Sequence, residues 1–397
     1  MIQLSDRLLA MEESATIAMS RKSRELKAEG KDIISLSLGE PDFHTPDFIK
    51  QAAVEAMEQN YTMYTPVPGY DDLRETICEK FERDNGIHYT KDQIVVSTGA
   101  KQSIANVVMS LVNPGDEVII PAPYWVSYIE IVKVAEGIPV IVNADISADF
   151  KVTGKQLEEA ITPKTKLIIF STPCNPTGSV YSKAELKELA EVICRHKNIV
   201  ALCDEIYEHI NFVGKHESLA QFPEVYDQVV TVNGVSKAWA MTGWRLGYIG
   251  APKEIAAACS KVQGQFTSGT SSITQRATIA ALKKDPAFLK DMLVAFKNRR
   301  KLVLEALQNM QGVRVNEPGG AFYFFPDISS FFGKSYNGTV IHNANDLTLY
   351  LLEEALVALV TGDAFGDPNC IRISYATDEA TLTKAMERIA AALNKLK

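Results

Sequence analysis

The chain has 397 residues, of which 46% are hydrophobic and 23% are charged, a balance typical of a globular protein large enough for two domains. Its formal net charge is −8 at pH 7 and no block of lysines or arginines stands out, which tells against a nucleic acid or an anionic membrane as partner. The N-terminus lacks the apolar core of a signal peptide and no run reaches membrane-spanning length, so we expect a cytoplasmic protein.

In chain order, the first part predicts a helix, a half-exposed strand and two more helices. The first helix covers residues 16–29, and residues 33–38 alternate apolar and polar side chains like a strand that stops before Gly39-Glu-Pro-Asp-Phe43. A second helix opens at Thr45-Pro46-Asp47, with an N-cap, an N1 proline and an acidic first turn. The third helix is amphipathic and contains Leu73, Ile77 and Phe81.

From Gln93 onward the pattern changes to an alternation of apolar strands and helices. The strands are expected at 94–96, 117–120, 139–142, 167–170, 199–203, 229–232 and 245–249. Two of the intervening helices begin with a capping box, Thr153-x-x-Gln156 and Ser182-x-x-Glu185. Continuous apolar strands that alternate with helices predict an α/β fold, in which a mainly parallel seven-stranded sheet is covered by helices.

The C-terminal part reads as a smaller α+β unit. Helices are expected at 287–310, 346–360 and 378–396, and strands at 313–315, 321–325 and 370–375. We therefore predict a large domain at 45–286 and a small domain made of 1–44 with 287–397. The six cysteines (Cys78, Cys174, Cys194, Cys203, Cys259 and Cys370) form no C-x-x-C pair, so we expect reduced thiols and neither a disulfide framework nor a metal site.

Ligands of parallel α/β sheets bind beyond the carboxyl ends of the strands, so the residues there are the candidates for function. They are Gly99-Ala100-Lys101, Trp125, Asn175, Asp204 with Tyr207, Lys237 and Arg245. The Gly99–Lys101 turn opens a helix, whose N–H groups and dipole suit a phosphate, and the guanidinium of Arg245 suits the same anion.

Each of these residues also has an ordinary structural interpretation. Lys237 lies among small and apolar neighbours, which favours an amine that loses its proton, although most lysines are simply solvated. Asp204 ends a strand and needs a cation or a strong donor if it is buried, or it caps a helix. Trp125 is either a stacking platform or a core aromatic residue.

One ligand would use all of these groups: pyridoxal phosphate (PLP), a phosphorylated pyridine aldehyde that joins a lysine and pairs its ring nitrogen with an acid. The motifs that carry a family resemblance are Gly39-Glu-Pro-Asp42, Tyr64, Gly69, Leu73-Arg74, Gly99-Ala-Lys-Gln102, Pro123-Tyr-Trp125, Asn175-Pro-Thr-Gly178, Asp204-Glu-Ile-Tyr207, Ser236-Lys-Ala238, Met241-Thr-Gly-Trp-Arg245, Gly319-Gly-Ala-Phe-Tyr323 and Arg372-Ile-Ser374. In this order they resemble fold-type I PLP enzymes, specifically class I aminotransferases of the bacterial aspartate aminotransferase subgroup. The resemblance covers nearly the whole chain and implies the PLP-dependent transferase fold.

The resemblance also implies a role for each candidate. Lys237 would bind PLP and move the proton, Asp204 would keep the ring nitrogen protonated, and Trp125 would stack on the ring. The ring oxygen of PLP would accept hydrogen bonds from Tyr207 and Asn175. The phosphate of PLP would be bound by Arg245, Gly99, Ala100, Lys101 and the partner subunit's Tyr64. Arg372, with Gly39 and Asn175, would hold the substrate α-carboxylate beside Trp125, while Thr16 and Lys101 would hold a distal carboxylate. Such shared sites imply a homodimer.

The function implied is a ping-pong transfer of the amino group of aspartate, or a related amino acid, to 2-oxoglutarate through PLP and pyridoxamine phosphate. Aromatic or prephenate amino transfer and a PLP-dependent β-lyase on the same fold are the alternatives. A PLP-binding regulatory module is disfavoured because no basic patch or DNA-binding segment is present. A dinucleotide-dependent dehydrogenase is disfavoured because no G-x-G-x-x-G lies at a strand–helix turn.

Overall fold

The central element of the computed structural model, which describes residue 2 and residues 4–397, is one seven-stranded sheet of order β2-β8-β7-β6-β5-β3-β4. Its strands are β2 (Ile94–Ser97), β3 (Glu117–Ala122), β4 (Ile138–Asn143), β5 (Thr165–Ser171), β6 (Val200–Asp204), β7 (Val229–Gly234) and β8 (Gly247–Gly250). Strands β3 to β7 pair in parallel, whereas β8 is antiparallel to both of its neighbours. The predicted mainly parallel sheet is confirmed.

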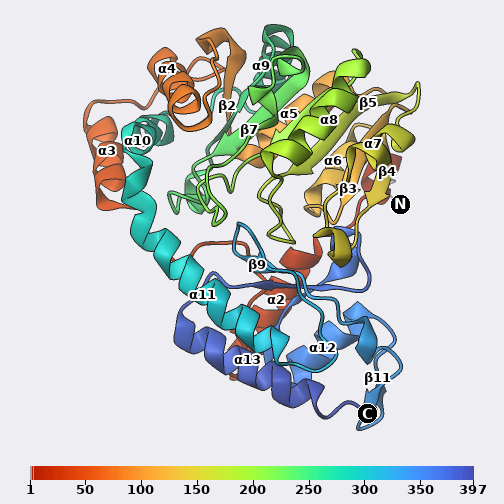
Figure 1. The fold of residues 1–397 in the computed structure, drawn as a ribbon. Coiled ribbons are helices and arrows are strands. Elements are labelled where there is room, and N and C mark those ends of the chain that lie inside the picture. Colours follow the sequence, from red (N-terminus) through yellow and green to blue (C-terminus); the bar gives the residue numbers. More distant parts are fainter. Residues whose placement is uncertain (1, 3) are drawn as a thin grey trace.

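Helices cover both faces of this sheet (Figure 1). They are α3 (Asp47–Glu58), α4 (Asp71–Lys80), α5 (Ala100–Leu111), α6 (Ser127–Val134), α7 (Gly154–Ala160), α8 (Lys183–Arg195), α9 (Lys253–Phe266) and α10 (Ser272–Lys283). Alternate residues of β5 enter different apolar clusters: Leu167 and Ile169 pack into one, and Ile168 and Phe170 into the other. This alternation is why the strand reads as a continuous apolar run.

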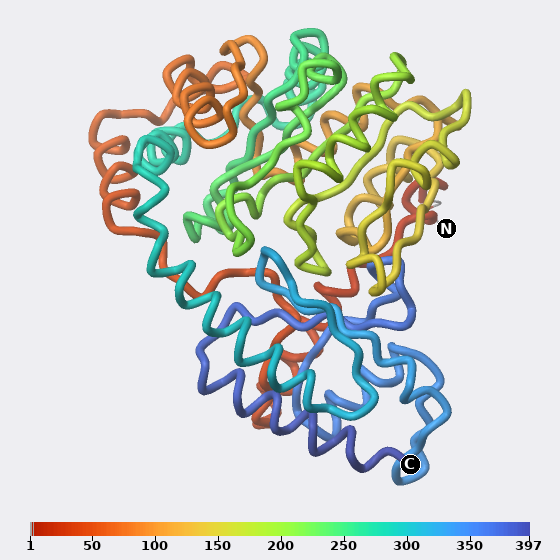
Figure 2. The backbone as a smooth tube through the Cα atoms, viewed as in Figure 1, coloured from red at the N-terminus to blue at the C-terminus, as the bar shows by residue number. Residues whose placement is uncertain are grey.

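A second, smaller part lies beyond the sheet, and the long helix α11 (Lys290–Gln308) runs from the first part to the second (Figures 1 and 2). Its other helices are α2 (Ala15–Ala28), α12 (Ala344–Glu354) and α13 (Glu379–Leu393). Its short strands are β1 (Ile34–Ser35), β9 (Tyr323–Phe324), β10 (Ser335–Tyr336), β11 (Thr339–Val340), β12 (Val357–Ala358), β13 (Val360–Thr361) and β14 (Ile371–Ser374). The short helix α1 (Asp6–Leu9) precedes α2.

The N-terminal segment packs with the C-terminal part of the chain. Strand β1 pairs in parallel with β12, and the N–H of Ser374 in β14 donates to the carbonyl of Leu36 at 2.9 Å. In Figure 1 helix α2 accordingly lies among the blue C-terminal elements, and Figure 2 shows the same arrangement of the backbone. The division into 45–286 and 1–44 with 287–397 stays a prediction, and its residues 1 and 3 lie outside the described part of the chain.

Several predicted elements were wrong in their extent. The helix expected at 346–360 ends at Glu354, because Leu356 has a φ of 55° in the left-handed region, and β12 and β13 follow. Arg245 was placed in a strand, but its φ of 56° excludes extended backbone and β8 begins at Gly247. Pro46, and not Thr45, is the N-cap of α3, and the hydroxyl of Thr45 instead donates to the carbonyl of Ala240.

Other predicted strands are shorter than expected or absent, and two helices were missed. Residues 313–315 form only an isolated bridge between Arg314 and Asp327, and the strands expected at 33–38 and 321–325 shorten to β1 and β9. Helices α9 and α10 were not predicted, because the fully buried polar residues Gln263 and Gln275 interrupt their apolar faces.

All six cysteines are free thiols. Over the described residues, no helix is both long enough and apolar enough to cross a membrane.

Both predicted capping boxes are present, and the one on α8 gives a test of local stability. The N–H of Glu185 donates to Oγ of Ser182 at 3.3 Å, and the N–H of Ser182 donates to the Glu185 carboxylate at 2.7 Å. Ser182→Ala should lower the free energy of unfolding, measured with urea, by about 1 kcal/mol. Lys187→Ala, at an exposed position of the same helix, should change it by less than about 0.5 kcal/mol, and equal effects of the two variants would contradict this.

Candidate active site

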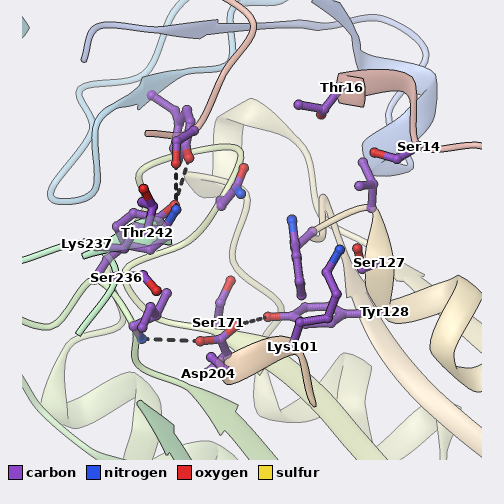
Figure 3. Close-up of a pocket in the computed structure, with 18 of the residues that line it drawn as sticks. Ser14, Thr16, Lys101, Ser127, Tyr128, Ser171, Asp204, Ser236, Lys237 and Thr242 are labelled. Carbon is purple, nitrogen blue, oxygen red and sulfur yellow. Dashed lines mark hydrogen bonds between the residues drawn. The ribbon is translucent and has the colours of Figure 1, made fainter. Parts of the chain in front are cut away.

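A cavity of about 250 Å³ lies where the carboxyl ends of the central strands meet the smaller part of the molecule. Figure 3 shows Lys237, Asp204, Lys101 and Thr16 around it. The predicted site residues that line it are Thr16, Gly39, Ala100, Lys101, Trp125, Asn175, Asp204, Tyr207, Lys237, Arg245 and Arg372. Residues from distant parts of the chain thus converge in one place, as the rule for strand ends predicts.

Lys237 follows β7, and its ammonium lies in the cavity without a carboxylate within ion-pair distance among the described residues. Nζ of Lys237 donates to the carbonyl of Gly39 at 2.6 Å. Burial lowers the pKa of Lys237 to about 8, and the nearby charge of Arg372 acts in the same direction. A substantial fraction of this amine is therefore neutral near pH 8, so it is available as a base or a nucleophile.

Asp204 ends β6 and is only 5% exposed. Its Oδ2 accepts a hydrogen bond from the phenol of Tyr128 at 2.9 Å, and its Oδ1 accepts one from the N–H of Ile206 at 3.2 Å. Burial raises the pKa of this carboxyl to about 6, although both hydrogen bonds lower it. A buried carboxylate held in this way attracts a positively charged ring nitrogen more strongly than an exposed carboxylate in water would.

Arg372 lies on β14 and is 2% exposed. Its guanidinium donates to the carbonyl of Ser37 at 2.6 Å and to Oδ1 of Asn175 at 3.0 Å, and it lies 3.4 Å from Oγ1 of Thr16. Its Nε is buried and has no partner, and no described carboxylate lies within ion-pair distance. A buried cation without a counter-ion is costly, so the site is built for an anion that enters with the ligand.

The opposite side of the cavity carries two more cations. The ammonium of Lys101 lies 5.0 Å above the ring of Trp125, and burial followed by the charge of Arg245 lowers the pKa of Lys101. Arg245 donates to the carbonyl of Thr242 at 2.9 Å, and a Cβ at Gly99 would collide with its Nη2. Gly99, with a φ of 85°, is therefore required beside Arg245.

The N-terminus of α5 completes this anion-binding corner. The first N–H groups of a helix lack intrahelical partners, and those of Ala100 and Lys101 have no other hydrogen-bond partner among the described residues. Together with Arg245 they form a set of donors suited to a phosphate. Although the whole chain is acidic, this cavity carries four basic side chains against Asp204.

Two predicted residues lie elsewhere. Tyr64 is 100% exposed and does not line the cavity. Gly99 does not line the cavity either, but it lies against the guanidinium of Arg245, which does. Tyr207 does line the cavity, where its phenol exchanges a 2.7 Å hydrogen bond with the phenol of Tyr323. Burial, followed by Tyr323, keeps the pKa of Tyr207 well above its ordinary value, so the phenol stays protonated and can donate.

Several lining residues were missed as site residues: Ser14, Ile17, Val126, Ser127, Tyr128, Ser171, Ile206, Ser236, Thr242 and Tyr323. Ser171 is the last residue of β5, so the rule for strand ends indicates it. Tyr128 lies one helical turn after Trp125 in an apolar pattern, and nothing in the sequence distinguishes it from a core aromatic residue. Its contact with Asp204 becomes visible only in three dimensions.

Known proteins resemble this chain over its full length. A family model described as aminotransferase class I and II matches residues 31–389. A bifunctional aspartate aminotransferase and glutamate/aspartate-prephenate aminotransferase of Petunia hybrida is 47% identical over 401 residues, which cover 100% of this chain and 84% of that protein. An aspartate/prephenate aminotransferase of Cereibacter sphaeroides is 48% identical over 391 residues, 98% of each chain.

Solved structures agree with these sequence matches. The crystal structure of the aspartate aminotransferase from Rhizobium meliloti superposes with a TM-score of 0.97 at 44% identity and covers 100% of both chains. The aspartate aminotransferase from Thermus thermophilus with maleate superposes with a TM-score of 0.93 at 40% identity, covering 99% of this chain and 100% of that one.

The raised pKa of Asp204 predicts a pH-dependent cost in the protein stripped of any ligand. The pKa of Asp204 is about 6 in the folded protein and has an ordinary value of 3.8. Below pH 4 this carboxyl is protonated and its burial costs little, whereas the cost of burying the ionised carboxylate develops as the pH rises from 4 to 6. Asp204→Asn should therefore gain stability over the wild type at pH 7 relative to pH 4, by roughly 3 kcal/mol in urea unfolding. A pH-independent difference between Asp204→Asn and the wild type would contradict the assignment.

Proposed function

The chain belongs to the family of class I and II aminotransferases, and we propose that it moves the amino group of aspartate, or of a related amino acid, to 2-oxoglutarate with PLP as cofactor. The observation that carries this proposal is that one lysine with a lowered pKa, one buried acid and one buried arginine, which pairs with no carboxylate among the described residues, line a single cavity. Relatives named as aspartate aminotransferases support the choice of substrate.

The residues of the cavity fit PLP at each of its polar groups. Asp204 is a buried acid for the ring nitrogen, the α5 N-terminus and Arg245 are donors for a phosphate, and the Tyr207 phenol is a donor for a ring oxygen. Lys237 supplies the amine that the aldehyde of PLP needs. When bound, PLP withdraws electrons from the substrate Cα, which lowers the cost of removing its proton.

The chain's own residues then bind, orient and move the proton. The guanidinium of Arg372, which lines the cavity, holds the α-carboxylate and thereby gains a counter-ion. Lys237 takes the α-proton at Nζ, and a pKa of about 8 suits a base that works near neutral pH. Asp204 keeps the ring nitrogen charged, and Trp125 presents a flat face for stacking.

A distal carboxylate would be bound on the side of Thr16 and Lys101. Lys101 has no described ion-pair partner, and the hydroxyl of Thr16 lies beside Arg372. These groups suit a dicarboxylic substrate better than an aromatic one. Relatives named aspartate/prephenate aminotransferases support prephenate as a second amino acceptor.

The exposed Tyr64 supports a homodimer with shared sites. It lies in the segment between α3 and α4 with its side chain fully exposed, as we expect of a residue that contributes to the phosphate site of a second copy. The boundaries 45–286 and 1–44 with 287–397 are proposed as the large and small domains of each subunit.

Replacing the lysine tests the chemistry. Lys237→Ala should still bind PLP through the ring and phosphate contacts, but amino transfer from aspartate to 2-oxoglutarate should fall by on the order of 10³-fold or more, because the base is lost. Glutamate formation and the visible spectrum of the protein measure the two effects. Near-normal turnover by this variant would contradict the proposal.

Comparing aspartate with phenylalanine tests the substrate. The half-reaction with aspartate should be faster in the wild type, and Lys101→Met should lower kcat/KM for aspartate about tenfold or more, because a charged hydrogen bond to the distal carboxylate is lost. Its effect on phenylalanine should stay below about threefold. Lys155→Met, at an exposed position outside the cavity lining, is the matched control. A strong preference of the wild type for phenylalanine would contradict the assignment.

A further inference from the structure

A second cluster of polar and charged side chains is buried beside the segment 204–208, which carries Asp204 and Tyr207. Its members are Lys80, Asp84, Asn85, Glu205, Glu208, His209, His216 and Ser218. None of these described residues lines the cavity. The mechanism proposed above therefore gives them no role.

The cluster is held by a continuous chain of contacts. Lys80, with 0% exposure, forms an ion pair with Glu208 and donates to Oδ1 of Asn85 at 2.8 Å. Nδ2 of Asn85 donates to Oε2 of Glu208 at 2.9 Å and to Oγ of Ser218 at 3.2 Å. Ser218 in turn donates to Oε2 of Glu205 at 2.6 Å. The helix that ends with Lys80 is thus connected to both glutamates of the segment.

The local backbone explains how one helix end supplies two of these contacts. Residues Phe81–Asn85 form a π-helical turn after α4, in which the hydrogen bonds run between residues five apart. Lys80 and Asn85 are five residues apart, so the π turn favours their approach. π turns interrupt a regular helix and are frequent at functional sites.

Neighbouring charges change the pKa values of Glu208 and His216 in the cluster. Burial alone would raise the pKa of Glu208, but Lys80, His209 and His216 lower it to about 2, so this carboxylate is ionised. Burial lowers the pKa of His216, yet the carboxylate of Glu205 at 2.9 Å outweighs burial and raises it. A buried ion pair contributes little net stability compared with well-packed apolar side chains, which favours a role in specifying a conformation.

The segment 204–208 divides its side chains between the two sites. Asp204 and Tyr207 line the cavity, whereas Glu205 and Glu208 enter the cluster. The N–H of Glu208 donates to the carbonyl of Glu205 at 2.9 Å, which closes the turn between them. Because Tyr207 and Glu208 are neighbours in this turn, a shift of Glu208 would move the Tyr207 phenol and the Asp204 carboxylate.

We propose that Lys80, through Glu208 and Asn85, is a positioning residue that holds the turn 204–208 so that Asp204 and Tyr207 face the ring of PLP. This inference rests on the proposed function, because it assigns the cluster to the cofactor side of the same site. Residues that hold a ligand-binding side chain in place commonly affect affinity even though they do not touch the ligand. At metal sites, the loss of such a residue lowers metal affinity or activity on the order of 10–100-fold.

The test compares variants of the PLP-loaded enzyme. Lys80→Met/Glu208→Gln removes both charges and leaves neither one buried alone, so the protein should fold. We expect it to release PLP about tenfold faster than the wild type and to show weaker circular dichroism of bound PLP in the visible range. Ser218→Ala removes one link only and should change both quantities in the same direction by a smaller factor.

The control separates positioning from general destabilisation. Ile389→Ala opens a space in α13, which contributes no residue to the cavity, and should lower the melting temperature while PLP release stays within about twofold of the wild type. Wild-type release and wild-type circular dichroism in the double variant would overturn the inference. A wild-type protein that shows no PLP absorbance at all would instead overturn the proposed function, and this inference with it.

Discussion

A buried guanidinium that pairs with no carboxylate in the described part of the chain sets the requirements for the rest of the active site. Arg372 is surrounded by neutral acceptors, the carbonyl of Ser37 and the amide of Asn175, and by the rings of Tyr323 and Phe365, each 4.7 Å from the guanidinium carbon. These neighbours orient the charge but do not neutralise it. Burying this uncompensated positive charge costs free energy, and a substrate carboxylate removes that cost when it binds. In the same way, a positively charged ligand group would compensate the buried carboxylate of Asp204.

The residues of the active site come from both parts of the molecule. Asp204 is the last residue of β6, which pairs with a strand on each side, and Tyr207 and Lys237 lie a few residues beyond β6 and β7. Thr16 and Arg372 come from α2 and β14 in the smaller part. The groups proposed to govern the chemistry therefore come from the part that carries the large sheet, whereas the groups proposed to bind the substrate come from both parts, because Lys101 lies on α5.

Much of this arrangement could be predicted from the sequence, because apolar strand runs and the rule for strand ends act locally. Asp204 and Lys237 each follow such a run and line the cavity. What could not be predicted depends on contacts between distant residues. Nothing near Tyr128 indicates that its phenol meets Asp204, and nothing near Lys80 indicates that its ammonium meets Glu208.

Local geometry also defeated some predictions. The apolar run at 245–249 suggested that Arg245 begins a strand, but a left-handed residue turns its side chain toward Gly99 instead. Leu356 similarly ends α12 before its apolar pattern ends. Positive φ values at bulky residues are rare, and no local pattern announces them.

The pairing of β1 with β12 has a consequence for how the protein is made. A ribosome releases the N-terminal segment first, but its partner strand emerges only near the end of synthesis. Throughout translation Leu36 lacks its hydrogen-bond partner Ala358, and Ser37 cannot accept from Arg372. The strands of the large sheet can pair before the C-terminal strands are synthesised, whereas the N-terminal segment stays unpaired until then. The substrate site is therefore the last part of the nascent chain to be completed.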